Sequence, residues 1–362
     1  MTTYLLAGGG TAGHVNPLLA IADAITAREP DATVLVLGTT EGLEARLVPA
    51  RGYELLIVPR LPFPRRPSKA ALTFLPRFNR AIDEVAALLR ARAVDVVVGF
   101  GGYVATPAYL AARRAKVPIV IHEANAKPGL ANKLGARFTN HVGVAFSGTA
   151  IQHGQFVGMP LRREIETLDR PATKAAAQEF FGLNPALPTL LVTGGSLGAR
   201  RINRTVVDAA ALITAAGWQV LHITGTKAEV TDPGLPGYTM IAYCDRMDLA
   251  LSSADFAISR AGAATVSELS ALGIPAVYVP YPVGNGEQRF NAAGVIAAGG
   301  GLIVDDADFV PTWVASDLLP VLADPQAIHT MGEAARSVGV LDGSARMLEL
   351  VGAALGTEIH RP

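Results

Sequence analysis

A short apolar run, a glycine-rich turn and a stretch with helical spacing follow one another at the start of this chain, and the same succession returns near its middle. Residues 4–7 (YLLA) lead into residues 8–13 (GGGTAG), and residues 189–192 (TLLV) lead into residues 193–199 (TGGSLGA). A buried strand joined through a tight turn to a helix is the repeating unit of parallel α/β sheets. The repetition therefore predicts two domains of this kind.

Further apolar runs alternate with helical stretches in both halves, as expected for doubly wound sheets. They lie at residues 33–37, 94–98 and 118–121, and again at 220–223, 256–258 and 276–279. A length of 362 residues also suits two domains. We predict an α/β fold with two Rossmann-like, doubly wound parallel-sheet domains that face a cleft.

The domain boundary is expected where the chain becomes rich in Gly and Pro and then charged, between residues 155 and 170. The first domain is expected at residues 1–161 and the second at residues 162–340. Residues 341–362, rich in Ala and Leu, are expected to form a terminal helix that returns to the first domain.

Composition excludes several classes of protein. The chain has 31 basic residues (Lys and Arg) and 31 acidic residues (Asp and Glu). It therefore has no net positive charge that would attract nucleic acid. The single cysteine, Cys244, excludes a disulfide framework and a multi-cysteine metal site. Prolines interrupt the long uncharged stretches, and no basic segment followed by a long apolar one stands at the start. We expect a soluble cytosolic protein without a membrane span.

The first glycine loop matches the pattern G-x-G-x-x-G and predicts an anion site, because bare backbone amides at a helix N-terminus approach phosphates closely. The helix is expected to start with Asn16 as N-cap and Pro17 at its first position. A dinucleotide fold would carry an acidic residue at the end of the second strand, but Glu41 comes late there. A nicotinamide site is therefore weakly supported, and a purely structural glycine turn is the alternative.

His14 directly follows this loop and is a candidate general base. A histidine that only hydrogen-bonds the loop is the alternative interpretation. The second loop, residues 193–200, repeats the same arrangement and adds the hydroxyl of Ser196. Two such loops in two domains indicate a ligand, or a pair of ligands, with several phosphates.

Residues 259–268 (SRAGAATVSE) follow a predicted strand and open a predicted helix. Thr265 and Glu268 have the spacing of a T-x-x-E capping box. On spacing alone, this structural interpretation is slightly favoured over a functional one. In the functional interpretation, the small residues 262–264 admit a phosphate to the helix end and Glu268 binds a ribose diol.

Two further patterns have competing interpretations. Asp306 and Asp308 form a D-x-D pair, but a turn or helix cap explains them better than a metal, and we expect no protein-held metal or cofactor. Residues 61–80 contain Arg65, Arg66 and Lys69 among aromatic residues, without an acid. This segment predicts either a surface for anionic lipid headgroups or an irregular loop with tucked-in aromatics.

Seven segments in order along the chain resemble the MurG family of peptidoglycan N-acetylglucosaminyltransferases. They are residues 9–17 (GGTAGHVNP), 99–106 (GFGGYVAT), 121–133 (IHEANAKPGLANK), 158–162 (GMPLR), 193–203 (TGGSLGARRIN), 259–268 and 284–292 (GNGEQRFNA). The resemblance covers nearly the whole length. It implies a GT-B fold and transfer, with inversion, of GlcNAc from UDP-GlcNAc to the MurNAc C4 hydroxyl of lipid I, giving lipid II.

The resemblance also implies site residues. It places substrate contacts at Thr11, Ala12, Gly13, Asn125, Arg162, Ser196, Ala263, Ala264, Thr265, Val266, Ser267, Glu268 and Gln288, with the backbone at Cys244 holding uracil. His14, or otherwise Glu123, would take the proton of the acceptor hydroxyl. Ala12 departs from the family's glycine, and would be strained if its backbone needs a positive φ. Residues 284–288 depart from the family's Gln-Gln form, which leaves the role of Glu287 open.

The implied partners are UDP-GlcNAc, a polyprenyl-linked acceptor, an anionic membrane surface contacted through residues 61–80, and other cell-wall synthesis proteins; no nucleic acid is implied. The implied location is the cytoplasmic face of the cell membrane, as a peripheral protein. Three alternatives stay open at this point. They are another GT-B enzyme (a UDP-GlcNAc 2-epimerase or a natural-product glycosyltransferase), an NAD-dependent oxidoreductase, and a silent nucleotide-sugar-binding module.

Overall fold

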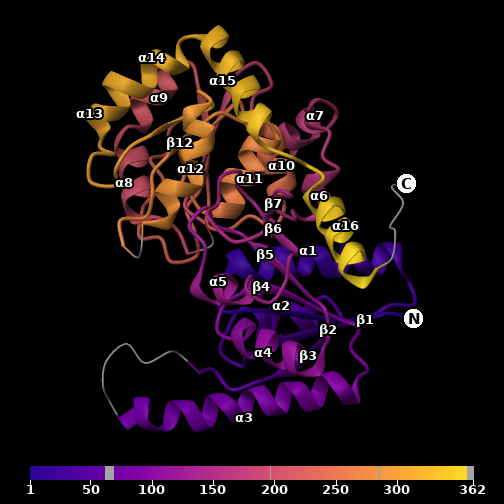
Figure 1. Ribbon diagram of the computed structural model, residues 1–362. Helices are drawn as coiled ribbons and strands as arrows, with labels where there is room; N and C mark the ends of the chain where they lie inside the picture. The colour runs from indigo at the N-terminus through magenta and orange to yellow at the C-terminus, as the bar shows by residue number, and fades with distance from the viewer. Residues whose placement is uncertain (62–68, 196, 284–285, 357–362) are drawn as a thin grey trace. The chain divides into compact units, whose positions relative to one another are not determined.

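The structure is a computed structural model that describes residues 1–61, 69–195, 197–283 and 286–356 (Figure 1). The chain forms two compact units. Met1–Arg163 and Asp342–Pro362 make up unit 1, and Glu164–Leu341 make up unit 2. The sequence-based segments ended instead at residues 161 and 340.

Unit 1 is built on a parallel seven-stranded sheet in the order β3-β2-β1-β4-β5-β6-β7. The sequential strands therefore run outward from β1 in both directions, as in doubly wound folds. The strands are β1 (Thr3–Gly8), β2 (Thr33–Gly38), β3 (Glu54–Ile57), β4 (Val96–Gly101), β5 (Ile119–Glu123), β6 (Val142–Val144) and β7 (Gly154–Phe156).

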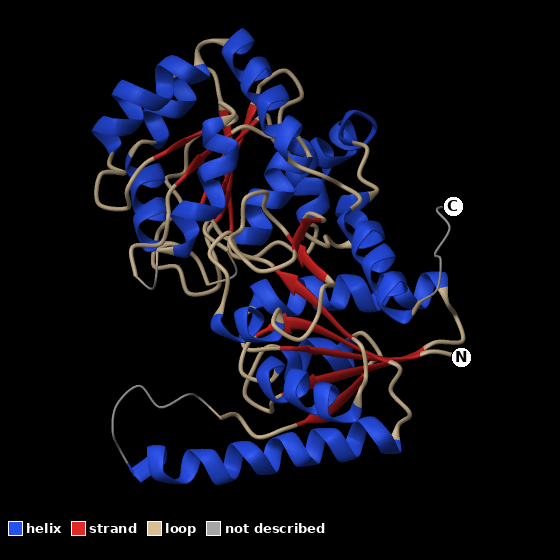
Figure 2. Ribbon diagram, in the orientation of Figure 1, coloured by secondary structure: helices blue, strands red, loops and turns tan. Residues whose placement is uncertain are grey.

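Helices cover both faces of this sheet (Figure 2). Leu5 and Ala7 of β1 pack into the core on one face with α3 and α4, whereas Tyr4 and Leu6 pack into the core on the other face with α1 and α16. Successive side chains of a strand point to opposite faces, so apolar residues at every position require two cores. The helices are α1 (Ala12–Arg28), α2 (Glu44–Ala50), α3 (Lys69–Ala91), α4 (Ala105–Ala115), α5 (Leu130–Gly135) and α16 (Gly343–Leu355).

The helix after the first glycine loop begins earlier than its sequence predicts. α1 starts at Ala12 with Thr11 as N-cap, and Pro17 lies inside the helix. The prediction of Asn16 as N-cap was wrong, because the glycine-rich loop already turns the chain into the helix before the proline. Ala12 is helical and is not among the residues with positive φ. Its replacement of a glycine therefore causes no backbone strain.

Unit 2 repeats the plan with a parallel six-stranded sheet in the order β10-β9-β8-β11-β12-β13. Its strands are β8 (Thr189–Thr193), β9 (Gln219–Ile223), β10 (Tyr238–Ile241), β11 (Phe256–Ser259), β12 (Ala276–Tyr278) and β13 (Gly301–Ile303). The two sheets confirm the predicted fold class of two Rossmann-like domains.

One core of unit 2 packs Leu190, Val192 and Phe256 of the sheet against Ile202 and Val206 of α8. The helices of this unit are α7 (Arg170–Phe181), α8 (Arg200–Asp208), α9 (Ala210–Ala215), α10 (Met247–Ser253), α11 (Ala263–Ala271), α12 (Glu287–Ala297), α13 (Pro311–Trp313), the π-helical turn η1 (Val314–Leu318), α14 (Leu319–Leu322) and α15 (Pro325–Val338). The short helix α6 (Arg163–Glu166) starts at the last residue of the first part of unit 1. No helix in the described part of the chain is long and apolar enough to cross a membrane.

In each unit the strand order reverses between two central strands, β1 and β4 in unit 1 and β8 and β11 in unit 2. Ligands of open α/β sheets bind outside the carboxyl ends of the strands at such a reversal. The loops that follow these four strands are therefore expected to form the ligand-binding sites.

Candidate active site

The loops after β1 and β4 of unit 1 are in close contact. A Cβ built on Gly102 would lie 2.7 Å from the carbonyl oxygen of Gly9, and Gly102 has a φ of +84°. Both the positive φ and the missing side chain are needed for this approach. The glycines of residues 99–106 thus hold the second loop against the first.

His14 lies where these two loops meet. Its Nδ1 is 3.1 Å from the carbonyl oxygen of Gly9 and 3.3 Å from Oγ1 of Thr11. The carbonyl oxygen only accepts hydrogen bonds, so Nδ1 carries the proton when it bonds to Gly9, and Nε2 is then the basic nitrogen. A Cβ on Gly101 would lie 3.2 Å from Nε2, so the glycine there leaves the space beside that nitrogen clear. This arrangement suits a general base.

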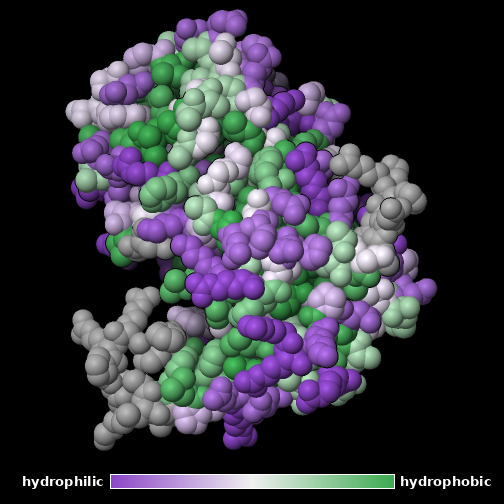
Figure 3. Space-filling view, viewed as in Figure 1, coloured by the Kyte–Doolittle hydropathy of each residue, from purple (hydrophilic) through white to green (hydrophobic). Residues whose placement is uncertain are grey.

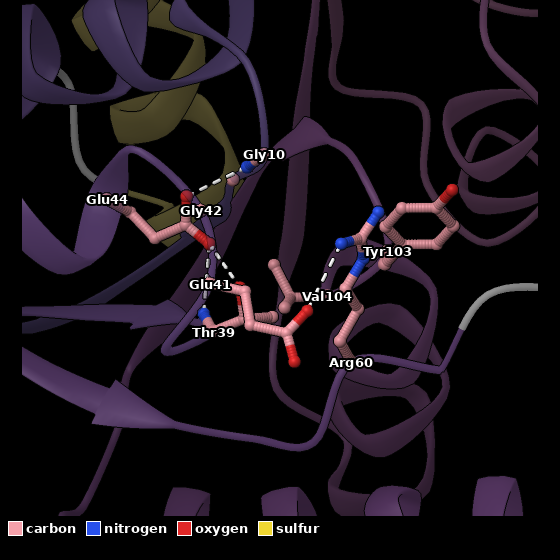
Figure 4. A pocket seen from close by; sticks show the side chains of 9 residues that line it. Gly10, Thr39, Glu41, Gly42, Glu44, Arg60, Tyr103 and Val104 are labelled. Atoms are coloured by element: carbon pink, nitrogen blue, oxygen red, sulfur yellow. Dashed lines mark hydrogen bonds and ion pairs between the residues drawn. The ribbon is translucent and has the colours of Figure 1, made fainter.

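The amide of Gly10 in the first loop already has an anionic partner from the chain itself (Figure 4). It donates to Oε2 of Glu44 over 2.8 Å, at one side of a small pocket lined also by Glu41, Arg60 and Tyr103. In a dinucleotide fold, amides of this loop face the pyrophosphate. The Glu44 carboxylate at this position therefore argues against a nicotinamide site.

The anion site expected of the whole loop is thus restricted to its last residues. The amides of Ala12 and Gly13 stand in the first turn of α1, where an α-helix provides no internal acceptor. Together with the side chain of Thr11, they are the groups of this loop suited to an incoming phosphate.

Glu123, the alternative base, is buried at the end of β5 with 2% of its surface exposed. Oε1 accepts from the amide of Asn125 (2.9 Å), and Oε2 accepts from the amide of Gly129 (3.0 Å) and from Nδ2 of Asn132 (2.9 Å). Asn132 in turn accepts from the buried hydroxyl of Tyr109 over 2.7 Å. These bonds make Glu123 a support for the loop that carries Asn125 and leave His14 as the better placed base.

In unit 2 the loops after β8 and β9 also touch through glycines. A Cβ on Gly198 would lie 2.3 Å from the carbonyl oxygen of Thr224, and a Cβ on Gly225 would lie 2.1 Å from the amide nitrogen of Gly198. The glycines of the second loop therefore serve close backbone packing as well as a turn. Ser196, predicted to offer its hydroxyl and amide, lies outside the described residues.

The loop after β11 leads into α11, which begins at Ala263 with Gly262 as N-cap. Thr265 is therefore the third residue of the helix and not its cap, so the capping-box interpretation of Thr265 and Glu268 was wrong. The small residues before the helix allow it to start three residues earlier than that box requires, with Gly262 and not Thr265 as the N-cap. Val266 and Ser267 are buried, whereas Ala264, Thr265 and Glu268 keep part of their surface exposed.

Two polar side chains fix the surroundings of this helix start. Arg260 donates to the carbonyl oxygen of Val279 (3.1 Å) and forms an ion pair with Asp306 (2.5 Å). Asn291 of α12 is buried and donates to the carbonyl oxygen of Ala261 over 3.3 Å. Asp306, part of the D-x-D pair, thus stabilises a loop through an arginine.

The remaining predicted contacts lie on separate elements. Gln288, on the first turn of α12, accepts from the amide of Tyr281 through Oε1 (2.9 Å). Cys244 is buried in the loop between β10 and α10, and Arg162 lies at the end of the first part of unit 1. The predicted positions of unit 2 that the structure describes therefore follow strands β10, β11 and β12, of which β11 and β12 are neighbours in the sheet.

Sequence reasoning missed the residues that support these loops. Glu44, Asn132, Arg260 and Asn291 were not assigned roles, although three of them stand in or beside the quoted segments. A buried polar residue has no local signal in the sequence, because its partners lie many residues away. The repeated glycines close to Glu44 were the one available hint.

Comparison with known proteins agrees with this geometry. The glycosyltransferase family 28 N-terminal domain matches residues 4–144, and the C-terminal domain of the same family matches residues 189–347. A protein of Leifsonia xyli subsp. xyli is 65% identical over 97% of this chain and 98% of its own length. It is named UDP-N-acetylglucosamine--N-acetylmuramyl-(pentapeptide) pyrophosphoryl-undecaprenol N-acetylglucosamine transferase.

Two solved structures are also similar. The crystal structure of MurG from Acinetobacter baumannii has a TM-score of 0.80 and 26% identity, covering 98% of this chain and all of that one. UDP-GlcNAc 2-epimerase from Neisseria meningitidis, bound to UDP-GlcNAc, has a TM-score of 0.68 at 14% identity and covers 97% of this chain and 99% of its own. The second likeness concerns the fold alone.

Proposed function

The chain belongs to glycosyltransferase family 28, and from this premise we propose how its residues bind two substrates and transfer a sugar. It is an N-acetylglucosaminyltransferase of peptidoglycan synthesis. It moves GlcNAc from UDP-GlcNAc to the undecaprenyl-pyrophosphate-linked MurNAc-pentapeptide, lipid I, and so forms lipid II. The observation that carries this function is the 65% identity, over nearly the whole length, to a relative named for that reaction.

For the donor, we place the diphosphate of UDP-GlcNAc at the start of α11. The amides of Ala263, Ala264 and Thr265 stand in its first turn, where a helix attracts negative charge. The loop of Ser196, in the same unit, would add donors to these phosphates, and we assign Arg162 to a substrate contact of its own. The helix amides and the Ser196 loop stabilise the charge that develops on UDP as the glycosidic bond breaks.

The other donor contacts follow from the positions around this helix. The proposal assigns the ribose to Glu268, the uracil to the backbone at Cys244, and the sugar to Gln288. Val266 and Ser267 are buried and would shape the site through packing and backbone. The hydrogen bond from the amide of Tyr281 holds the Gln288 side chain against its loop and pre-orients it.

For the acceptor, the proposal assigns the pyrophosphate to Thr11, Ala12 and Gly13, and a further polar contact to Asn125. The C4 hydroxyl would then approach Nε2 of His14. That nitrogen takes the proton while the oxygen attacks the anomeric carbon from the side opposite UDP, which inverts its configuration. The clear space that Gly101 leaves beside Nε2 supports this role.

For the membrane, the proposal assigns a peripheral position at the cytoplasmic face, with residues 61–80 in contact with anionic lipid. Residues 62–68, which include Arg65 and Arg66, lie outside the described residues. In the described part, Leu75 of α3 is 65% exposed, and hydrophobic side chains reach the surface in this lower part of the unit (Figure 3). Exposed apolar and cationic side chains on one helix favour a lipid surface. Other cell-wall synthesis proteins as partners remain part of the proposal.

The decisive experiment incubates the purified protein with labelled UDP-GlcNAc and a lipid I analogue, and identifies the products by mass spectrometry. A disaccharide-linked lipid and UDP are expected, and proton NMR of the product should show the inverted anomeric configuration. Formation of ManNAc without the acceptor would identify an epimerase instead. Binding of UDP-GlcNAc without any consumption would identify a silent binding module.

A further inference from the structure

Glu44, at the start of α2, is a charged side chain with no exposed surface. Its Oε2 accepts from the amide of Gly10 (2.8 Å), and its Oε1 accepts from the amide (3.0 Å) and the hydroxyl (2.8 Å) of Thr39. Burial alone would raise the pKa of this carboxyl, but the hydrogen bonds from Gly10 and Thr39 outweigh burial and lower the pKa. Glu44 is therefore an ionised carboxylate inside unit 1.

Three glycines pack directly against the side chain of Glu44. A Cβ on Gly9 would lie 2.4 Å from Oε1, one on Gly38 would lie 2.5 Å from Cγ, and one on Gly42 would lie 2.0 Å from Oε2. No real Cβ contact is that short, so these positions admit the carboxylate only because they are glycines. None of the three has a positive φ, so this packing, and not a turn, explains the glycines.

Such an arrangement is costly if it serves packing alone. Burying a carboxylate removes its hydration, and hydrogen bonds offset that loss only when they satisfy the charge. Among the ion pairs recorded for the described residues, none involves Glu44, so its partners are neutral donors. An apolar side chain would fill the same volume at lower cost, which indicates a role for the charge itself.

The role follows from the peptide group between Gly9 and Gly10. Its N–H end donates to Glu44, and its carbonyl oxygen lies 3.1 Å from Nδ1 of His14. A peptide group is planar, so fixing the N–H direction also fixes the carbonyl direction. A negative charge at the N–H end also polarises the group and makes the carbonyl oxygen a stronger acceptor.

We propose that Glu44 is a positioning residue for His14, acting through the Gly9–Gly10 peptide group. The carboxylate holds this group so that the Gly9 carbonyl takes the Nδ1 proton, which leaves Nε2 as the basic nitrogen beside Gly101. The negative charge also stabilises the imidazolium that forms when His14 accepts a proton. The inference rests on the proposed role of His14 as the base and deepens it.

Other charged groups lie around the same loop and stay constant in the experiment. Glu123 of β5 reaches this region through Asn132, and the ion pair of Arg60 and Glu41 (3.2 Å) lines the pocket beside Gly10. Only the difference between two variants that retain these groups isolates the effect of Glu44.

The first measurement follows His14 directly by ¹⁵N NMR of histidine-labelled full-length protein, with its signals assigned by comparison with His14→Ala. In Glu44→Gln the charge is removed at nearly constant volume. We expect the Nδ1-protonated tautomer of neutral His14 to lose population, as read from the ¹⁵N shifts of its two ring nitrogens, because the Gly9 carbonyl is no longer held toward Nδ1.

The matched control is Glu54→Gln, which removes an exposed carboxylate of β3 that pairs with Arg92. It should leave the His14 signals unchanged. Unchanged signals of His122 and His141, which belong to the same unit, would show that unit 1 of the variant is folded. If Glu44→Gln does not fold, Glu44→Asp replaces it, since the shorter side chain keeps the charge but withdraws it from Gly10.

The second measurement is the pH dependence of kcat with the lipid I analogue. For Glu44→Gln we expect kcat to fall at least tenfold, KM for UDP-GlcNAc to change less than twofold, and the acidic limb of the pH profile of kcat to move to lower pH. A uniform loss of activity without that movement would indicate a structural role and overturn the proposal. So would His14 signals that are the same in Glu44→Gln and wild type.

The two hypotheses fail in different ways. If His14→Ala retains wild-type turnover, the proposed base is wrong, whatever the NMR signals do. If His14→Ala is inactive but the ring-nitrogen signals of His14 are the same in Glu44→Gln and wild type, the base stands and the positioning role is overturned.

Discussion

His222 at the centre of unit 2 makes the stability of that unit sensitive to acid. Its Nε2 lies 3.2 Å from Oδ1 of Asn203, whose Nδ2 donates to the carbonyl oxygen of Thr224 over 2.7 Å, and its Nδ1 lies 2.7 Å from the hydroxyl of Tyr238. Because Asn203 thus presents its oxygen, Nε2 carries the proton and Nδ1 accepts from the Tyr238 hydroxyl. A second proton on Nδ1 would remove this acceptor, so the Tyr238 hydroxyl would have to turn and accept the hydrogen bond instead, and the ring would carry a charge in a buried site.

The magnitude follows from the pKa. Burial lowers the pKa of His222 from 6.5 to about 4. Between those two values the unfolded state binds more protons than the folded state, so the free energy of unfolding decreases as the pH falls through this window. The expected loss at pH 5.0, relative to pH 7.5, is about 2 kcal/mol from this histidine alone. At pH 4 and below the loss approaches roughly 3 kcal/mol.

The assay uses the two tryptophans of the chain, Trp218 and Trp313, which both belong to unit 2. Their fluorescence during urea unfolding therefore reports on this unit. The titration of Glu and Asp residues also changes the free energy of unfolding with pH. This change is common to all variants, so it cancels when two variants are compared. His222→Gln should be less stable than wild type at pH 7.5, but its further loss between pH 7.5 and pH 5.0 should be about 2 kcal/mol smaller.

His329→Gln is the matched control, because His329 lies on α15 of the same unit with two thirds of its side chain exposed. Its pH dependence should equal that of wild type. If His222→Gln and wild type lose the same free energy on acidification, within about 0.5 kcal/mol, the histidine is not held neutral by burial and the reasoning fails.

Three further outcomes are expected. His14→Ala should lower kcat by about 10² to 10⁴, the range of general-base catalysis, with the Kd for UDP-GlcNAc unchanged by calorimetry. Gly198→Ala should weaken UDP binding at least tenfold, since its Cβ would meet the Thr224 carbonyl at 2.3 Å with a φ of +83°. Leu75→Ser with Arg77→Glu should weaken sedimentation with anionic vesicles about tenfold, because each cation near such a surface contributes about 1 kcal/mol.

Each of these three predictions has a matched control variant, which separates the stated cause from a nonspecific effect of the substitution. His153→Ala removes an exposed histidine of unit 1 and should keep full turnover. Gly234→Ala changes a residue with a φ of +67° but with nothing within 4 Å, so equal weakening there would refute the clash at Gly198. Arg90→Glu, in the last turn of α3, should leave vesicle binding intact, and equal loss would point to net charge alone.

The fold could be predicted because its determinants are local. Runs of apolar residues at every position require strands buried on both faces, and Leu5 and Leu6 of β1 indeed enter opposite cores. Helix starts were less predictable. Pro17 and Thr265 have the sequence marks of a first turn, yet both helices begin earlier, because glycine-rich loops turn the chain without a side-chain cap.

The loops that form the candidate site could be predicted from the sequence, but the residues that hold these loops in place could not. The motifs gave the loop that carries His14 and the helix start near Ala263, since these depend on glycines and small residues in sequence. The hydrogen bond from Gly10 to Glu44 spans 34 residues, and that from Arg260 to Val279 spans 19. No local pattern specifies such pairs. They follow only from the order of the strands.

The first glycine loop shows how one motif can serve two chemistries. In a dinucleotide fold the pattern G-x-G-x-x-G leaves backbone amides open for a pyrophosphate. Here the amide of Gly10 is bound to the Glu44 carboxylate, and the same negative charge repels a phosphate that approaches Gly9 or Gly10. In the proposed acceptor site, a pyrophosphate would therefore approach the amides of Ala12 and Gly13 in the first turn of α1, two to three residues further along. The carboxylate thus opposes the nucleotide position of a dinucleotide fold and is compatible with the acceptor position that we propose.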